Sequence, residues 1–418
     1  MDALTQILAG LDAMRPDLTA FYTDLHRHPE LSMQETRTAS KAAERLRSAG
    51  YSVTAGIGKT GVVGILENGV GPTVMLRADM DALPVREQTG LAYASEVSGV
   101  DGDGEHVPIM HACGHDLHVT CLCAAAELFA HNRDRWAGRL MMVFQPAEEI
   151  GSGARAMIND GLFDRFGNPD VVLGQHVTPA PAGSLSWRSG VTMSAADSFE
   201  IKLFGRGSHG SRPQSSVDPV VMAASLVMRL QTIVAREVAP SDHVVVTVGS
   251  LHAGTKENII PDQASIKLNV RSFSPPVRLR VLDAIKRIAV AEAAASGAPR
   301  EPEFRPLNSF PILANDPEAT GRTVGALTRH FGDDRVSEIP LVSASEDFGE
   351  FGTASGAPSV FWYFGGLDPE HLRKAHEEGR LEEIPSNHSP MFAPIIEPTL
   401  TTGVQALVAC GLSWLRTK

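Results

Sequence analysis

The chain has 418 residues, 43% hydrophobic and 21% charged, which predicts two domains and is typical of a globular protein. Its 37 basic and 49 acidic residues give a formal net charge of −12, which argues against nonspecific binding to nucleic acid or to an anionic membrane. No apolar run reaches the roughly 18 residues of a membrane span, and the early acidic residues argue against a signal peptide. Four cysteines do not make a disulfide framework. We therefore expect a cytoplasmic protein.

Apolar spacing predicts alternating helices and strands in most of the chain. Helices are expected at 3–28, 34–49, 116–133 and about 399–415, and strands at 61–66, 73–76, 139–144, 170–173 and 359–364. Strands that alternate with helices favour an α/β fold with a mainly parallel sheet flanked by helices. Ligands of such sheets bind at the carboxyl edge of the strands, so polar residues behind different strands can meet there.

Residues 194–306 follow a different pattern. Strands are predicted at 198–204, 243–251, 264–272 and 302–305, and helices at 217–236 and 276–296. The order βαββαβ is that of the ferredoxin-like split unit with an antiparallel sheet. Because α/β segments resume afterwards, we expect residues 194–306 to be inserted into a discontinuous domain of residues 1–193 and 307–418.

Cys113 and His115 are the first candidate metal ligands. A thiolate and an imidazole suit zinc and related divalent metals, and Gly114 lets the backbone bend so that both face one point. An isolated Cys-x-His would more often be a buried thiol beside a hydrogen-bonded histidine. His176 behind a strand and His388 between two prolines favour the ligand interpretation, although a loop histidine is commonly a surface residue.

Two pairs of acidic residues also follow predicted strands. Asp79 and Asp81 alternate along an extended segment and therefore share one side, where we expect Asp81 to orient a ligand imidazole. Glu148 and Glu149 could be a solvated helix start. In a non-helical turn they would point in different directions, so that one binds a metal and the other acts as general base. Together these residues predict a two-metal amidohydrolase.

The stretch Gly205–Gly210 matches the Gly-x-Gly-x-x-Gly fingerprint of dinucleotide-binding proteins. The fingerprint needs a helix at once and a βαβ unit; Pro213 delays the helix, and the βαββαβ order is wrong for it. We interpret the stretch as a loop that presents His209 to polarise a carbonyl. Asn258 and Arg271 are candidates for binding a substrate carboxylate, with turn and surface roles as the alternative.

The motifs occur in an order that resembles one known family. They are Arg-Ala-Asp-Met-Asp-Ala-Leu-Pro at 77–84, His-Ala-Cys-Gly-His-Asp at 111–116, Gln-Pro-Ala-Glu-Glu at 145–149, Gly-Gln-His at 174–176, Gly-Ser-His-Gly at 207–210, Asn-Ile-Ile-Pro at 258–261 and Asn-His-Ser-Pro at 387–390. The chain is similar to the aminoacylase/carboxypeptidase G metallopeptidases, in the branch of hippurate hydrolase, N-acyl-amino-acid amidohydrolases and auxin-conjugate hydrolases.

The resemblance implies a role for each motif residue. The implied metal ligands are Cys113, His115, Glu149, His176 and His388. Glu148 matches the general base and Asp81 the acid behind the ligands, whereas Asp79 stands where other branches have a ligand histidine. Cys113 would take the bridging place that an aspartate fills in those branches. His111 and His118 lie outside the Cys-x-His pair of Cys113 and His115 and are expected to be supporting or structural.

The resemblance also implies cofactors and partners. We expect two divalent metal ions per subunit, zinc or manganese, with nickel or cobalt also allowed, and a small N-acyl amino acid as substrate. The inserted domain would dimerise, in a homodimer or homotetramer, and His209 could reach the partner's site. The motifs do not separate this activity from a dipeptidase or an N-acetyl-diaminopimelate deacetylase. Alternatives of another class are a nucleotide-dependent oxidoreductase and a non-catalytic metal-binding protein.

Overall fold

The computed structural model describes residues 2–418, which form two compact units. The first unit runs to Gly190 and also includes Ala314–Pro340 and Asp347–Lys418. The second unit consists of Val191–Leu313 and Leu341–Glu346. The segment Leu341–Glu346 thus belongs to the second unit, whereas we expected all of residues 307–418 to belong to the first domain.

A nine-stranded sheet forms the centre of the first unit, in the order β1-β2-β6-β3-β7-β18-β8-β17, with β19 paired to β6. The strands are β1 (Ser52–Ile57), β2 (Gly61–Asn68), β3 (Thr73–Asp79), β6 (Trp136–Gln145), β7 (Val171–Pro181), β8 (Leu185–Trp187), β17 (Val336–Glu338), β18 (Ser359–Leu367) and β19 (Arg416–Thr417). The central strands β6, β3, β7 and β18 run parallel to one another. Every residue of β18 is buried, as expected for a parallel strand covered on both faces. The predicted mainly parallel α/β sheet is confirmed.

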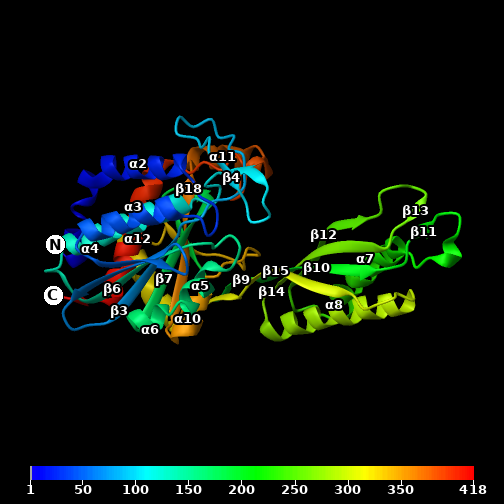
Figure 1. Ribbon diagram of the computed structural model, residues 1–418. Helices are drawn as coiled ribbons and strands as arrows, with labels where there is room; N and C mark the ends of the chain where they lie inside the picture. The colour runs from blue at the N-terminus through cyan, green and yellow to red at the C-terminus, as the bar shows by residue number, and fades with distance from the viewer. Residues whose placement is uncertain (1) are drawn as a thin grey trace. The chain divides into compact units, whose positions relative to one another are not determined.

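Helices cover both faces of this sheet (Figure 1). On one face lie α1 (Ala3–Leu8), α2 (Leu11–Arg27), α3 (Thr36–Ser48), α4 (His115–His131), α9 (Pro317–Phe331) and α12 (Ile396–Trp414), and on the other α5 (Gly153–Asn159), α6 (Leu162–Phe166) and α10 (Gly349–Ser355). The smaller elements are β4 (Ser98–Val100), β5 (His106–Pro108), β9 (Gly190–Met193), β16 (Leu313–Asn315) and α11 (Pro369–Glu377). The prediction of one helix over 3–28 is wrong, because the chain turns at Ala9–Gly10 and Gly10 is a poor helix former.

The second unit has the predicted βαββαβ order. Its elements are β10 (Ala195–Phe204), α7 (Pro219–Arg236), β12 (Val244–Ala253), β14 (Gln263–Ser272), α8 (Pro275–Ala295) and β15 (Glu303–Phe310), with a short pair of β11 (Ser208–His209) and β13 (Ile259–Ile260). The four long strands form an antiparallel sheet in the order β12-β14-β10-β15. The last strand is longer than the predicted 302–305, because it begins after Pro302 and pairs with β10 as far as Phe310.

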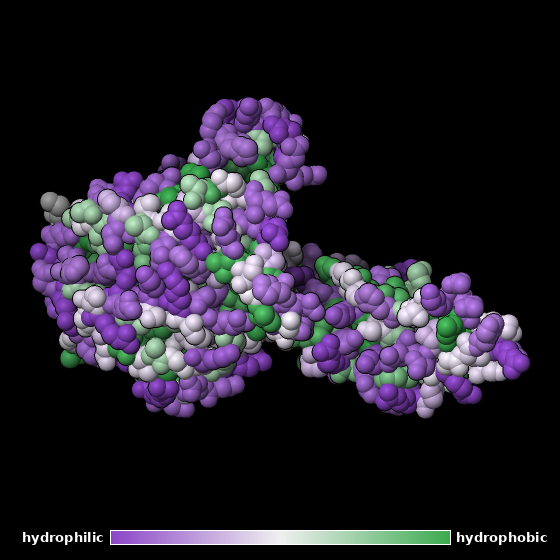
Figure 2. Space-filling view, turned by 45° about the horizontal axis from the view of Figure 1, so that its top comes forward, coloured by the Kyte–Doolittle hydropathy of each residue, from purple (hydrophilic) through white to green (hydrophobic). Residues whose placement is uncertain are grey.

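Within residues 2–418, α7 is the one helix whose length and apolar composition would allow it to cross a membrane. One side of α7 packs in the core of the second unit, where Met222, Leu226 and Leu230 are fully buried. The opposite side leaves Val221 and Met228 largely exposed. Hydrophilic residues predominate on the face seen in Figure 2, with apolar residues scattered among them. The apolar composition of α7 is therefore explained in part by its packing on the sheet.

The core of the second unit gives a first prediction. Ile285 and Leu279 both lie on α8, but Ile285 is 0% and Leu279 63% exposed. Ile285→Ala should lower the free energy of unfolding of this unit by about 2–5 kcal/mol, because it leaves a cavity. Leu279→Ala should change it by less than about 0.5 kcal/mol. Urea unfolding followed by circular dichroism measures both, and equal effects would contradict the described packing.

Candidate active site

The candidate site lies where β3, β6 and β7 approach one edge of the sheet. β3 ends at Asp79, and β6 ends at Gln145, shortly before Glu148 and Glu149. His176 does not end its strand as predicted, because β7 continues to Pro181 by pairing with β18. The three parallel strands thus bring distant acids and a histidine to one place, as expected for the carboxyl edge of such a sheet.

Gly114 shapes the turn that joins Cys113 to α4. Its φ is +82°, and a Cβ atom there would lie 2.4 Å from Val177 Cγ1, so only glycine fits without displacing β7. His115 is the first residue of α4, one position earlier than predicted. The amide of His388, itself at φ +71°, donates to Ala112 O at 2.8 Å. This bond holds the late His388 loop against the Cys-Gly-His turn.

The structure brings all the predicted metal-ligand side chains together. Two groups have donor atoms within 4.8 Å of one another: Cys113, Glu149 and His388, and His115, Glu148 and Glu149. Cys113 Sγ lies 3.4 Å from His176 Nε2, and His388 Nε2 lies 3.3 Å from Glu149 Oε2. His115 Nε2 and Glu149 Oε1 are buried and are among the side-chain atoms of residues 2–418 that have no hydrogen-bond partner. Buried nitrogen and oxygen atoms without such a partner are suited to bind a cation.

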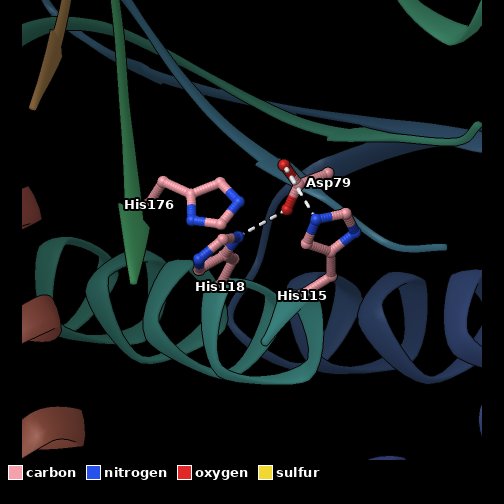
Figure 3. Close-up of side chains that lie close together, drawn as sticks. All are labelled: Asp79, His115, His118 and His176. Carbon is pink, nitrogen blue, oxygen red and sulfur yellow. Dashed lines mark hydrogen bonds and ion pairs between the residues drawn. The ribbon is translucent and has the colours of Figure 1, made fainter. Parts of the chain in front are cut away.

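His118 also lies in this cluster, beside Asp79, His115 and His176 (Figure 3). Its Nδ1 is 2.5 Å from Asp79 Oδ1, and its Nε2 accepts the amide of Val177 at 2.9 Å. Both ring nitrogens of His118 are therefore engaged, which leaves no lone pair for a metal. His176 differs, because its Nδ1 donates to Val177 O at 2.7 Å and its Nε2 faces Cys113.

The two aspartates at the end of β3, Asp79 and Asp81, have different contacts. Asp79 accepts from Arg77 Nη1 at 2.7 Å and from His118, so both its oxygens are used. Asp81 accepts the amides of Glu148 and Glu149, both at 3.1 Å, and its Oδ1 lies 3.4 Å from His115 Nδ1. Asp81 thus contacts a histidine of the cluster and the turn that carries the two glutamates.

The pKa shifts at the site arise from burial and from neighbouring charges of both signs. Burial and the carboxylates of Glu149 and Glu148 raise the pKa of the Cys113 thiol well above its usual value, so a thiolate there needs a cation. Burial lowers the pKa of His176 well below its usual value and keeps its ring neutral. Burial opposes ionisation of Asp79, but the Arg77 guanidinium outweighs it and lowers the pKa of Asp79 well below its ordinary value. This donor set fits divalent metal ions.

His209, Asn258 and Arg271 all lie in the second unit. His209 pairs with Ile259 through β11 and β13, and the amide of Gly210 donates to Asn258 O at 2.8 Å. His209 lines an open cavity of about 770 Å³. The cavity that His209 lines also includes Gln263, at the start of β14. Arg271 lies near the other end of this strand, where it donates to Ser343 O at 2.6 Å. The second unit therefore brings His209 and Asn258 together and keeps Arg271 apart from them.

Sequence reasoning missed several buried polar residues that surround the site. Glu35 is fully buried and accepts the amide of Ala147 at 2.8 Å, and burial followed by repulsion from Asp81 raises its pKa to about 7. Arg77 donates to Gln145 Oε1 at 2.7 Å, and Gln145 donates to Asp347 Oδ1 at 2.7 Å. The charged Arg77 within an apolar strand was the one signal in the sequence. Glu35 carries none, because an acid near the start of a predicted helix is common.

His26 is another buried residue that the sequence did not single out. Its Nδ1 lies 2.6 Å from Asp116 Oδ2, and its Nε2 lies 3.1 Å from Glu87 Oε1. Burial disfavours the imidazolium, but Asp116 and then Glu87 outweigh this effect and raise the pKa of His26 to about 9. His26 therefore joins the end of α2 to the start of α4 as a buried cation between two carboxylates.

Comparison with known proteins identifies the chain's relatives. The sequence model of peptidase family M20/M25/M40 matches residues 75–387. The chain belongs to this family. It is 40% identical over 331 residues to hippurate hydrolase of Campylobacter jejuni, covering 78% of this chain and 82% of that protein. It is 37% identical over 346 residues to thermostable carboxypeptidase 2 of Saccharolobus solfataricus, covering 82% of this chain and 84% of that protein.

A solved structure extends the likeness to the fold. The YXEP protein of Bacillus subtilis, described as a dinuclear metal binding peptidase from the M20 family, superposes with a TM-score of 0.74 at 29% identity. The match covers 96% of this chain and 98% of that one. The family resemblance is confirmed, and this M20-family chain is a metal-binding hydrolase of carbon–nitrogen bonds.

The buried His26 cation gives a prediction for pH dependence. Because its folded pKa of about 9 lies above the ordinary 6.5, its contribution to stability is fully present below about pH 6.5 and is lost as the pH rises through about 9. His26→Gln should therefore lower the melting temperature much more at about pH 6 than at about pH 10. A pKa shift of this size corresponds to a change of about 3 kcal/mol in the free energy of unfolding between low and high pH.

His28→Gln, at the exposed end of the same helix, is the control. Its effect on the melting temperature should be small at both pH values. An effect of His26→Gln that does not vary with pH would show that His26 is neutral in the folded protein.

Proposed function

We propose that this M20-family enzyme hydrolyses the amide bond of N-acyl-L-amino acids and releases a carboxylic acid and the amino acid. The observation that carries the proposal is the convergence of one set of side chains beside Glu148: Cys113, His115, Glu149, His176 and His388. The name of one relative, hippurate hydrolase, supports the substrate class. Hippurate-like, N-acetyl- and indoleacetyl-amino acids are the candidate substrates.

The proposed cofactor is a pair of divalent metal ions. Cys113, His115, Glu149, His176 and His388 would hold them, and zinc or manganese, with nickel or cobalt also allowed, would suit this mixture of sulfur, nitrogen and oxygen donors. When bound, the cations polarise the amide carbonyl and lower the pKa of a water molecule. The buried donors His115 Nε2 and Glu149 Oε1, which lack hydrogen-bond partners, support this assignment.

The chain's own residues would move the proton. Glu148, which is 5% exposed, would take a proton from the attacking water and pass it to the leaving amine as general base and then general acid. Asp81 would orient His115 while its hydrogen bonds to the amides of Glu148 and Glu149 hold the base in place. Asp79, whose oxygens bond to Arg77 and His118, would support the ligands without being one.

Substrate recognition is proposed for the inserted domain, residues 194–306. His209 would donate a hydrogen bond to the oxyanion, and Asn258 or Arg271 would bind the amino-acid carboxylate. We propose that this domain is a dimerisation and lid domain in a homodimer or homotetramer. We also propose that the enzyme is cytoplasmic and has no nucleic-acid or membrane partner.

The second candidate function is peptide-bond hydrolysis by a dipeptidase or carboxypeptidase, or deacetylation of an N-acetyl-diaminopimelate type of substrate. The relative named thermostable carboxypeptidase 2 favours it. The same metal site would serve both reactions, because each cleaves an amide next to a carboxylate-bearing residue. A hydrolysis panel of acetyl-, benzoyl- and indoleacetyl-amino acids against dipeptides separates the two, and exclusive cleavage of dipeptides would reject the first proposal.

Glu148→Gln tests the proposed base. The variant should lose about 10²–10⁴-fold in kcat and keep its metal, because the amide side chain retains the shape but cannot take the proton. Glu149→Gln is the matched control at the neighbouring position and should lose metal as well as activity. Elemental analysis and turnover of a benzoyl-amino acid measure both effects. A fully active Glu148→Gln enzyme would reassign the base.

Mixing two inactive variants tests whether sites are shared between subunits. His209→Ala should lower turnover strongly because the oxyanion loses a donor. If His209 acts in the partner's site, mixed dimers of His209→Ala and Glu148→Gln chains contain one complete site and regain part of the activity. The absence of any regained activity, in mixtures shown to exchange subunits, would assign His209 to its own subunit or deny it a role.

A further inference from the structure

The turn that carries Glu148 and Glu149 is held by carboxylates from elsewhere in the first unit. It spans residues 146–152 between β6 and α5 and has no regular secondary structure. The amide of Ala147 donates to Glu35, and those of Glu148 and Glu149 donate to Asp81. The geometry of the turn therefore depends on groups that are distant in the sequence.

Glu35 stands out among these groups because its side chain makes only structural contacts. It is 0% exposed and lies directly before α3. Its Oε1 accepts the amides of both Met33 and Ala147 at 2.8 Å, and its Oε2 accepts the hydroxyl of Thr60 at 2.5 Å. One carboxylate thus joins three separate segments behind the active site.

Both amides that Glu35 binds belong to non-glycine residues with a left-handed backbone. The φ of Met33 is +64° and that of Ala147 is +49°, a conformation that a residue with a Cβ atom rarely adopts without support. Ala147 is fully buried, so water cannot replace its hydrogen bond if the carboxylate is removed. The strained residue directly precedes Glu148, and its conformation sets the direction in which the base points.

A second contact supports the same arrangement. Ser32, beside Met33, donates to Asp81 Oδ2 at 2.6 Å, and the same oxygen accepts the amide of Glu149. The segment 32–35 therefore contacts the glutamate turn through Glu35 directly and through Asp81 indirectly. These two sets of hydrogen bonds hold the segment 32–35 against the turn of residues 146–152. Apolar packing alone has no such directionality and would not fix the orientation of the turn.

We propose that Glu35 is a positioning residue for the reaction, which holds Ala147 in its left-handed conformation and so aims Glu148 at the reacting water. The proposal rests on the proposed role of Glu148 as base. Without the carboxylate, the turn relaxes toward an ordinary backbone conformation and the Glu148 side chain moves away from its working position. Glu35 itself touches neither substrate nor reacting atoms.

Variants of Glu35 test the proposal in the full-length, metal-loaded enzyme. Glu35→Ala should lower kcat about 10- to 100-fold, as is typical when a group behind an active site is removed, with KM nearly unchanged. Glu35→Gln should recover most of kcat, because its amide oxygen still accepts both backbone amides and its NH₂ group faces the Thr60 hydroxyl. Equal losses in both variants, or full activity of Glu35→Ala, would overturn the proposal.

Glu30→Ala is the matched control. Glu30, like Glu35, lies in the segment before α3. It accepts the amides of Arg37 and Thr38 at 2.9 and 2.8 Å, so it caps α3 and does not bind the amide of Ala147. Its loss should lower the melting temperature and leave kcat unchanged. If Glu30→Ala reduces kcat as much as Glu35→Ala does, the effect is general destabilisation and the positioning role is rejected.

A second substitution tests the backbone argument itself. Glycine adopts a positive φ without strain, so Ala147→Gly should restore part of the kcat lost in Glu35→Ala. No recovery in the double variant would mean that Glu35 does not act through Ala147.

Hydrogen exchange provides a readout that does not depend on activity. In metal-free and metal-loaded protein, the amides of residues 147–152 should exchange faster in Glu35→Ala than in the wild type or Glu30→Ala. Unchanged exchange would reject the positioning role even if Glu148 is the base. Faster exchange together with an active Glu148→Gln enzyme would show that Glu35 holds the turn but that the proposed base is wrong.

Discussion

The carboxylate of Asp81 connects the two segments on which the active site depends. It lies 3.4 Å from His115 Nδ1 at the start of α4 and accepts the amides of Glu148 and Glu149 behind β6. Because Asp81 is 1% exposed, these donors, and not water, stabilise its charge. The positions of the histidine and of the two glutamates are therefore coupled through one side chain, and the parallel sheet provides the edge at which this coupling is possible.

Around that connection the first unit buries the carboxylates of Asp79, Asp81 and Glu148 and the thiol of Cys113. Arg77 donates a hydrogen bond to Asp79, and the nearby carboxylates raise the pKa of Cys113. Such a cluster stays ionised only with a cation in reach, because the uncompensated burial of a charge is costly. The fit of this site to metal ions thus has a direct electrostatic reason in the chain's own residues. Two of the non-glycine residues with a positive φ, Ala147 and His388, also lie here.

The second unit is built on a different principle. Its sheet is antiparallel, its core consists of two helices on four strands, and its polar candidates lie on loops and strand ends. A backbone hydrogen bond between Gly210 and Asn258 brings Asn258 beside His209, whereas Arg271 lies near the opposite end of β14. In our proposal, residues of the first unit cleave the bond and loops of the second unit recognise the substrate. The sequences of these loops can vary without disturbing the metal site.

The main strands, the ferredoxin-like order and the motif residues follow from local patterns: apolar runs, helical spacing and residue types with a known chemistry. The break after α1, the contact of Glu35 with Ala147 across 112 positions and that of His26 with Asp116 across 90 were not predictable, because they depend on which buried groups meet after folding. His118 illustrates the difference most clearly. Its ring resembles that of His115 as a ligand, but hydrogen bonds to Asp79 and Val177 occupy both nitrogens. Residue type and spacing determined which side chains could bind a metal, whereas tertiary hydrogen bonds decided which of them keep a free electron pair to do so.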